Sequence, residues 1–180
     1  MKINFGIHKR KTLIIGDNKK MRPTQSMAKS IIFNVLEIDE NKSVLDLFSG
    51  TGALGFEAAS LGAEKVYWID NNLETIMAIN ENIKRLKLDQ NNFKAFKTDF
   101  RRALKKINFK PDIIFLDPPF IATKYYDEAL KIINDNNILA DDGVIVLEKN
   151  NNLQINEFKS YKIILNKIMG NKNIIFLKRS

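Results

Sequence analysis

The feature that most constrains the fold is a short apolar run that ends in an acid and continues into a glycine-rich segment. Residues 44–55 read Val-Leu-Asp-Leu-Phe-Ser-Gly-Thr-Gly-Ala-Leu-Gly, and Gly50, Gly52 and Gly55 have the spacing G-x-G-x-x-G. Glycine permits a sharp turn and lets a ligand approach the backbone. A helix that follows directs its free N–H groups toward that ligand. We therefore predict a strand, a turn and a helix that bind a cofactor, although several nucleotide cofactors use such glycines.

Strand-like and helix-like segments alternate after this point. The strand-like runs are 44–48, 66–69, 93–97, 113–116 and 144–147, and the helical segments lie near 53–61, 72–87, 100–107 and 125–137. This alternation predicts right-handed crossovers and a mostly parallel sheet. Two further apolar runs, 161–168 and 173–177, flank Met-Gly-Asn-Lys and predict an antiparallel hairpin. We predict a doubly wound α/β sheet of seven strands, closed by that C-terminal hairpin.

The N-terminal segment is basic. Residues 1–22, which we call the basic arm, combine short apolar runs with a Gly-Asp-Asn turn and predict a loose hairpin. Its candidate phosphate contacts are Lys9, Arg10, Lys11 and Arg22. A solvated, flexible tail is the alternative interpretation. A helix is expected from Pro23, with core positions Met27, Ile31, Ile32, Phe33, Val35 and Leu36. We interpret residues 1–180 as one domain, the arm followed by a core of residues 23–180.

The composition limits the classes of function. The formal net charge is +8 and the isoelectric point is about 9.5, which favours a polyanionic partner such as RNA. A lysine-rich genome is the plainer explanation of the same charge. The absence of cysteine and the single histidine, His8, exclude Cys/His zinc sites and disulfides, and we expect no metal. No signal sequence or membrane-spanning run is evident, so we expect a soluble, cytoplasmic protein.

Acids follow four of the predicted strands. They are Asp46, Asp70, Asp99 and Asp117. Ligands bind at the carboxyl ends of the strands in sheets of this kind, so we expect the four carboxylates at one edge. Asp70 follows Gly50 by about 20 residues, the spacing of a carboxylate that binds a ribose. Asp46 occupies a place where a dinucleotide-binding strand is usually apolar. We interpret it as facing a cationic ligand, such as the sulfonium and ammonium groups of S-adenosylmethionine.

The strongest chemical signal is Asp117-Pro118-Pro119-Phe120, which we call the acceptor segment. The two prolines fix φ and offer no N–H donor, so this stretch presents only hydrogen-bond acceptors. Phe120 adds a flat apolar face. Acceptors beside an aromatic ring suit a planar base with an exocyclic amine. A rigid proline turn with a core phenylalanine is the alternative interpretation.

These motifs resemble a known family. Residues 46–55 resemble the glycine-rich motif of class I S-adenosylmethionine-dependent methyltransferases, and residues 117–120 resemble their (Asp/Asn)-Pro-Pro-(Phe/Tyr) amino-methylation motif. Arg-Pro-Thr at residues 22–24 opens a helix that ends in Phe-Asn-Val-Leu at 33–36, which is similar to the bacterial 16S ribosomal RNA guanine-N2 methyltransferases. Ser26 and Ser30 depart from this pattern, because family members often carry acids there.

The resemblance implies a Rossmann-like fold, S-adenosylmethionine as cofactor, and 16S ribosomal RNA or the 30S subunit as partner. By resemblance, Asp46, Ser49, Gly50 and Gly52 surround the methionine part of the cofactor, and Phe48 is a further cofactor-binding residue. Asp70 would bind the ribose with Asn71 beside it, and Asp99 with the backbone of Phe100 would meet the adenine. The acceptor segment, Asp117, Pro118, Pro119 and Phe120, would hold the target guanine. The alternatives are a DNA adenine-N6 or cytosine-N4 methyltransferase, an NAD-dependent oxidoreductase, and a non-catalytic RNA-binding assembly factor.

Overall fold

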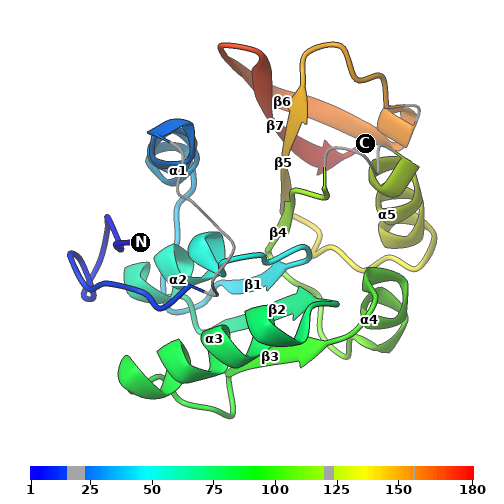
Figure 1. Cartoon of the computed structure of the whole chain (residues 1–180). Helices are drawn as coiled ribbons and strands as arrows, with labels where there is room; N and C mark the ends of the chain where they lie inside the picture. The colour runs from blue at the N-terminus through cyan, green and yellow to red at the C-terminus, as the bar shows by residue number, and fades with distance from the viewer. Residues whose placement is uncertain (16–22, 120–123, 156) are drawn as a thin grey trace.

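The computed structural model describes residues 1–15, 23–119, 124–155 and 157–180. They form one seven-stranded sheet with helices on both faces (Figure 1). The strands are β1 Ser43–Asp46, β2 Lys65–Asp70, β3 Phe93–Lys97, β4 Ile113–Leu116, β5 Val144–Asn150, β6 Tyr161–Met169 and β7 Lys172–Arg179. The helices are α1 Pro23–Val35, α2 Ala53–Leu61, α3 Leu73–Arg85, α4 Phe100–Lys106 and α5 Lys124–Asp135, with the short η1 at Glu157–Ser160.

The strand order β3-β2-β1-β4-β5-β7-β6 is the order of a doubly wound sheet. Strands β1 to β5 pair in parallel, whereas β7 is antiparallel to both β5 and β6. The predicted parallel sheet and its C-terminal antiparallel hairpin are therefore confirmed. All residues of the central strands β1 and β4 are buried, because helices cover both of their faces. None of the helices within the described ranges is long and apolar enough to cross a membrane.

Two apolar layers hold the helices on the sheet. Val44 of β1 belongs to the layer that includes side chains of α1, α2 and α3, and its neighbour Leu45 belongs to the layer beneath α4 and α5. Successive side chains of a strand point to opposite faces, so a short strand contributes to both layers. The parallel strands end at a common edge of this sheet, which we call the carboxyl edge.

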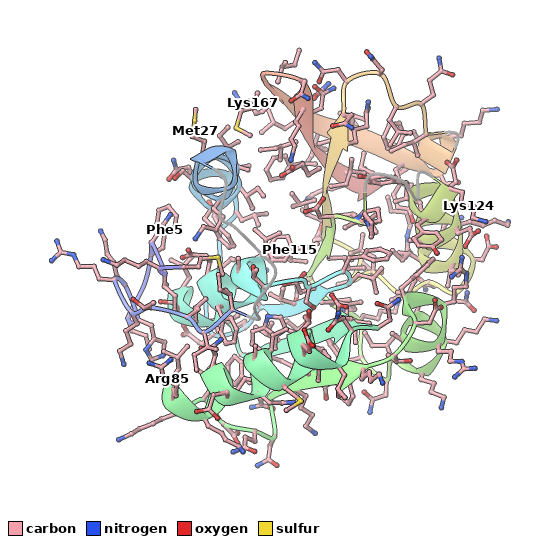
Figure 2. All side chains as sticks on the ribbon, in the orientation of Figure 1. Phe5, Met27, Arg85, Phe115, Lys124 and Lys167 are labelled. Carbon is pink, nitrogen blue, oxygen red and sulfur yellow. The ribbon has the colours of Figure 1, made fainter. Side chains whose placement is uncertain are left out.

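The apolar stripe predicted for α1 is wrong at two positions. Met27 and Val35 are 58% and 41% exposed, and Met27 extends outward from α1 in Figure 2. The predicted core positions Ile32 and Phe33 are confirmed, and Ala28 is buried beside them. Phe33 decides the orientation, since its large ring packs 5.8 Å from the ring of Phe115 in β4. The apolar spacing in the sequence could not show whether the stripe with Met27 and Val35 or the stripe with Ala28 and Ile32 faces the sheet.

The described part of the basic arm is an irregular hairpin, as predicted. A single antiparallel bridge joins Lys2 to Thr12, and the N–H of Ile3 donates to the carbonyl of Lys11 at 3.0 Å. Ile3 and Leu13 are buried in the layer beneath α1 to α3. These contacts contradict a solvated, flexible tail for residues 1–15. The predicted Gly-Asp-Asn turn, residues 16–18, lies outside the described residues.

Candidate functional site

The four predicted acids lie at the ends of four strands that are neighbours in the sheet. Asp46 and Asp70 end β1 and β2, Asp117 follows β4 directly, and Asp99 follows β3 after one residue. Their strands have the order β3-β2-β1-β4. The prediction that these residues share the carboxyl edge is confirmed, and the edge also carries the turn between β1 and α2.

That turn, Ser49 to Gly52, is fixed by bonds to the adjacent strands. The N–H of Ser49 donates to the carbonyl of Ile69 at 2.9 Å, and its hydroxyl bonds the carbonyls of Asp46 and Ile69 at 2.8 and 3.0 Å. Gly50 and Gly52 have φ values of 51° and 74°, a left-handed conformation that favours glycine. Two of the three glycines are therefore required by the path of the backbone.

Gly55 has a different role. A Cβ atom at this position would lie 2.2 Å from Nε1 of Trp68, which is fully buried in β2. The same Nε1 donates a hydrogen bond to the carbonyl of Gly52 at 3.1 Å. The third glycine of the motif thus allows close packing of α2 on the sheet, and it does not serve ligand approach as the spacing alone suggested.

Asp46 is a buried carboxylate, only 3% exposed. Its Oδ2 accepts a hydrogen bond from the N–H of Gly55 at 3.1 Å. Burial raises the pKa of Asp46 to about 7; the Gly55 bond opposes this rise and the charge of Asp70 adds to it. A positively charged ligand beside this carboxylate would favour its ionised form. The residue is therefore suited to an ammonium or sulfonium group.

Asp70 links the turn to the start of α3. Its Oδ2 accepts the N–H of Gly50 and its Oδ1 accepts the N–H of Asn72, both at 2.9 Å. Asn72 in turn caps α3 by accepting the N–H of Thr75 at 3.1 Å. The predicted ribose contact Asn71 is exposed between them. Asp70 itself is only partly buried.

Asp99 caps α4 and forms an ion pair. It accepts the N–H of Arg101 at 2.9 Å, and its other oxygen lies 3.0 Å from Nη1 of Arg101. Arg101 also forms an ion pair with Glu128 of α5. The guanidinium group of Arg101 therefore connects Asp99, a predicted adenine contact, to α5, the helix that follows the acceptor segment. Sequence reasoning missed this pair, because nothing in the spacing relates residues 101 and 128.

Three aromatic rings lie together next to Asp99. The ring of Phe100, which is buried, lies 5.0 Å from that of Phe48 and 5.1 Å from that of Tyr125. Arg101 stacks over Phe100 at 4.3 Å and over Tyr125 at 4.9 Å. The structure thus brings together Phe48 and Phe100, two predicted cofactor contacts, and adds Tyr125, which sequence reasoning missed.

In the described part of the acceptor segment, Asp117 and Pro119 are exposed and Pro118 is buried. Phe120 lies outside the described residues. Behind the segment, the buried hydroxyl of Tyr126 donates to the carbonyl of Glu148 at 2.6 Å. Burial raises the pKa of Tyr126, and the negative charge of Asp117 contributes to that rise. A rigid, buried tyrosine therefore lies close to the exposed carboxylate.

The predicted RNA contacts lie away from this edge. Lys9, Arg10 and Lys11 are exposed at the tip of the arm, and Arg22 lies outside the described residues. The N–H groups of Ile7 and His8 donate to Ser60, near the end of α2 that is remote from the glycine turn. The cations are thus separated from the carboxyl edge by roughly the length of α2, about 13 Å at 1.5 Å per residue.

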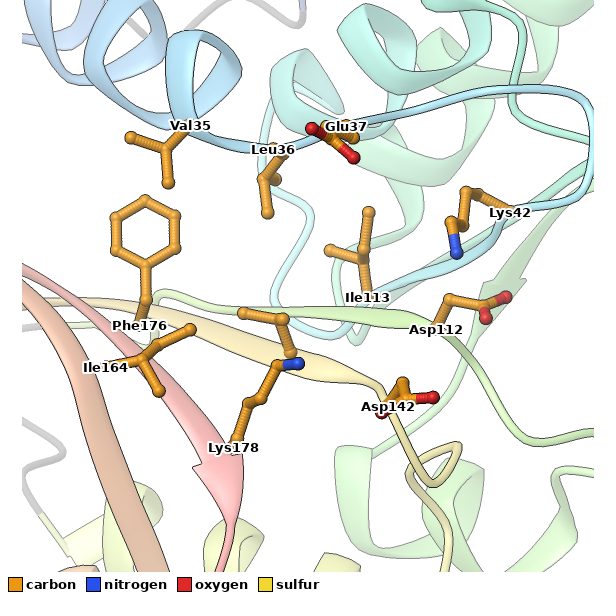
Figure 3. Close-up of a pocket in the computed structure, with 11 residues that line it drawn as sticks. Val35, Leu36, Glu37, Lys42, Asp112, Ile113, Asp142, Ile164, Phe176 and Lys178 are labelled. Carbon is orange, nitrogen blue, oxygen red and sulfur yellow. The ribbon is translucent and has the colours of Figure 1, made fainter.

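A pocket lies at the edge of the sheet opposite the carboxyl edge (Figure 3). It includes Asp112 and Asp142, which precede β4 and β5, together with Val35 at the end of α1 and Phe176 of β7. It therefore belongs to the amino ends of the parallel strands. Of the predicted cofactor-binding and base-binding residues that the structure describes, none lines this pocket.

A family model described as "Conserved hypothetical protein 95" matches residues 1–178 of the chain. The chain belongs to this family. A relative from Buchnera aphidicola, named ribosomal RNA small subunit methyltransferase D, is 32% identical over 155 residues, which are 85% of this chain and 78% of the relative. The sequence resemblance to ribosomal small-subunit RNA methyltransferases is thereby confirmed over most of the chain.

Solved structures share the fold. An Escherichia coli protein described as a methyltransferase, yhhF, superposes with a TM-score of 0.86 over 100% of this chain and 98% of that chain, at 24% identity. Another methyltransferase structure, which contains S-adenosylhomocysteine, gives a TM-score of 0.69 over 95% of this chain and 52% of that chain, at 18% identity. At these identities the likeness establishes the fold alone, a Rossmann-like α/β sheet.

Proposed function

We propose that this protein transfers a methyl group from S-adenosylmethionine to the exocyclic N2 of a guanine in 16S ribosomal RNA. One structural relationship carries the proposal. Asp46 of β1 lies in register with Phe115 of β4, so that Asp117 follows two residues beyond the carboxylate suited to a cationic donor. Neighbouring strands are about 4.8 Å apart, which brings the donor and acceptor sites within reach of a direct transfer.

The residues at the carboxyl edge fit the cofactor. Asp46 would bind a cationic part of the methionyl group. Its carboxylate is buried away from water, so a nearby positive charge would stabilise the ionised form. The left-handed glycines at 50 and 52 let a ligand approach the turn without side chains in the way. Asp70 would accept bonds from ribose hydroxyls. When bound, S-adenosylmethionine supplies a methyl group activated by its sulfonium. The solved methyltransferase with S-adenosylhomocysteine has the same fold, which supports this assignment.

The acceptor segment would prepare the amine. Asp117 and the carbonyl of Pro118 are acceptors, and the prolines offer no competing donors. Hydrogen bonds from the guanine amine to these acceptors would favour a pyramidal nitrogen, whose lone pair is then available to the methyl carbon. The carboxylate also stabilises positive charge that develops on nitrogen as the new N–C bond forms. The N–H proton is then released to Asp117 or to solvent, which leaves the methylated amine neutral.

An RNA substrate agrees with the charge of the chain and with its relatives. The net charge of +8 favours a polyanion, and the Buchnera relative is named for the small ribosomal subunit. A guanine must leave its base stack to reach the acceptor segment at the carboxyl edge, so a single-stranded or locally opened region is the expected target. The substrate would be 16S RNA, either free or within an assembling 30S subunit.

The decisive experiment measures methyl transfer from labelled S-adenosylmethionine to 16S RNA and to 30S subunits isolated from a strain that lacks this gene. The modified nucleotide is then mapped by primer extension and mass spectrometry. We expect one guanine to acquire an N2-methyl group. Labelling of DNA, or of an adenine or cytosine, would replace the proposal with one of the alternative methyltransferases.

A ligand-stability measurement separates the cofactor classes. S-adenosylhomocysteine should raise the melting temperature and NAD should leave it unchanged, since only ligands that bind the folded state stabilise it. The Asp46→Asn variant is the matched control, because it removes the charge and keeps the side-chain shape. Stabilisation by NAD alone would contradict the assignment of the cofactor.

A further inference from the structure

We propose that Glu57 of α2 is a positioning residue that fixes the basic arm as a preformed surface for RNA. This inference rests on the RNA substrate of the proposed function, but it concerns a different part of the molecule. Glu57 is 1% exposed although it is ionisable and lies in the middle of a helix. A buried carboxylate needs partners, and the partners of this one are in the arm and in α1.

The carboxylate of Glu57 binds the backbone of the arm directly. Oε1 and Oε2 accept the N–H of Asn4 at 2.9 and 3.0 Å, and Oε2 accepts the N–H of Phe5 at 3.1 Å. Lys29 of α1, itself 6% exposed, donates to Oε1 at 2.6 Å and to the carbonyl of Lys2 at 3.1 Å. Hydrogen bonds from N–H groups to a buried charge are strong and directional. Glu57 and Lys29 therefore fix three positions of one arm segment, residues 2, 4 and 5.

Ser60 continues this contact one helical turn later. Its hydroxyl donates to the carbonyl of Phe5 at 2.5 Å and accepts the N–H of His8 at 2.9 Å, while its carbonyl accepts the N–H of Ile7 at 2.8 Å. Gly6 lies against the same residue with φ of 72°, and a Cβ there would be 1.8 Å from the Ser60 carbonyl. Residues three apart on a helix share one side, so Glu57 and Ser60 form a continuous attachment along α2.

The arm depends on this attachment because its own hairpin is weak. In the described residues one bridge and three backbone hydrogen bonds join its two halves, and an isolated two-stranded hairpin of that length is marginal in water. The attachment also fixes the arm relative to the reaction site. The ring of Phe5 lies 6.1 Å from that of Phe33, which packs on Phe115 of β4, and the Thr51 hydroxyl contacts the sulfur of Met1 at 3.7 Å.

The tip therefore offers its cations in a fixed arrangement. Lys9, Arg10 and Lys11 are all exposed, and Arg10 has a left-handed φ of 72° in a turn held by the Lys9 and Lys11 N–H groups. A surface that is ordered before binding does not lose the conformational entropy of ordering when RNA binds. Loosening the arm should consequently weaken RNA binding while the carboxyl edge continues to function.

Two variants test this inference. Glu57→Gln removes the charge, and Ser60→Ala removes one hydroxyl and is the milder change. The matched control is Asp112→Asn, because Asp112 accepts the N–H and the hydroxyl of Ser43 at 2.8 Å, and these bonds join the amino ends of β1 and β4 rather than the arm. All three proteins are compared in methyl transfer, in direct RNA binding, in S-adenosylhomocysteine binding and in amide hydrogen exchange of residues 2–11.

The expected result is a rise in KM for RNA of about tenfold for Glu57→Gln and a smaller rise for Ser60→Ala. The kcat and the affinity for S-adenosylhomocysteine should stay within about twofold, and exchange should increase in the arm. Asp112→Asn should lose stability without a change in KM. If the arm variants lose stability but keep the wild-type KM and RNA affinity, Glu57 is only structural and the inference is wrong.

The failure of the proposed function gives a different pattern. A wild-type protein that binds RNA but methylates none contradicts the proposed reaction, and the binding comparison alone then decides the role of Glu57. A wild-type protein that binds no RNA contradicts both. If Glu57→Gln does not fold, Ser60→Ala gives the same comparison.

Discussion

The N–H of Gly55 donates a hydrogen bond to the carboxylate of Asp46 at 3.1 Å, so that the end of β1 is tied to the first turn of α2. This is the strongest stabilising interaction for the charge of Asp46, yet burial still raises the pKa of Asp46 to about 7. Asp46 is therefore costly to ionise in the free protein. A buried carboxylate with a raised pKa is a candidate site for a ligand that favours its charged form.

The first prediction concerns stability. Because the pKa of Asp46 is raised by folding, its contribution to stability is greatest below about pH 4 and is lost as the pH rises through about 7. Asp46→Asn removes the cost of ionisation and keeps an oxygen for the Gly55 N–H. At pH 8 we expect a gain of about 2–4 kcal/mol in the free energy of unfolding, since one pKa unit is worth about 1.4 kcal/mol. Urea unfolding of the wild type and the variant at pH 5 and pH 8 measures this gain in the free energy of unfolding, which should be smaller at pH 5.

The second prediction concerns the pH dependence of cofactor binding. A cationic ligand must meet the ionised form of Asp46, so binding below the pKa of about 7 displaces a proton. The Kd of S-adenosylhomocysteine, measured by calorimetry from pH 5.5 to 7, should fall by up to about tenfold per pH unit. The Asp46→Asn variant should bind weakly and without this dependence. An equal pH dependence in both proteins would assign the proton to another group.

A third prediction tests the packing role of Gly55. Gly55→Ala would place a Cβ 2.2 Å from Nε1 and 2.5 Å from Cε2 of Trp68, so α2 must move off β2. We expect a loss of about 1–3 kcal/mol in the free energy of unfolding, as in other overpacked cores. The chain has a single tryptophan, so the fluorescence of Trp68 reports the shift directly.

The control for this variant is Gly170→Asn in the turn between β6 and β7. Gly170 has φ of 60° and open space around its Cα, and asparagine tolerates that conformation. Its unfolding free energy should change by less than about 0.5 kcal/mol, with unaltered tryptophan fluorescence. Equal losses in both variants would mean that backbone conformation, and not contact with Trp68, determines the cost at residue 55.

The sheet could be predicted from the sequence because its strands are short, apolar and separated by amphipathic helices. Residues 93–97 and 113–116 were predicted with the bounds of β3 and β4, and 53–61 with those of α2. The acids at the strand ends were equally visible, since parallel topology alone assigns them to one edge. These features depend on local patterns that tertiary contacts do not override.

The attachment of the arm could not be predicted, because it depends on distant side chains. Glu57 and Ser60 lie within a mostly apolar helix, and nothing near them in the sequence indicates that they bind residues 4 to 8. Asn82 of α3 likewise bonds both the N–H and the carbonyl of Ile14, at 2.9 and 2.8 Å. A polar residue within an apolar pattern shows only that a partner must exist.

The last prediction concerns the acceptor role of Asp117. Asp117 is exposed, so its substitution should leave the fold intact. Asp117→Ala removes both carboxylate oxygens and should lower kcat by at least about 100-fold, the usual loss for one electrostatic contact in a transition state. Asp117→Asn keeps one oxygen that accepts the amine N–H but lacks the charge, so we expect a loss of roughly tenfold.

The matched control for these variants is Asp141→Ala, which removes an aspartate whose side chain is 90% exposed at the opposite edge of the sheet. It should retain wild-type kcat. All three variants should bind S-adenosylhomocysteine with a Kd within about twofold of the wild type, because Asp46 and the glycine turn are untouched. Single-turnover transfer to RNA separates the chemical step from product release. Equal rates for Asp117→Ala and the wild type would show that the acceptor amine is activated by groups other than this carboxylate.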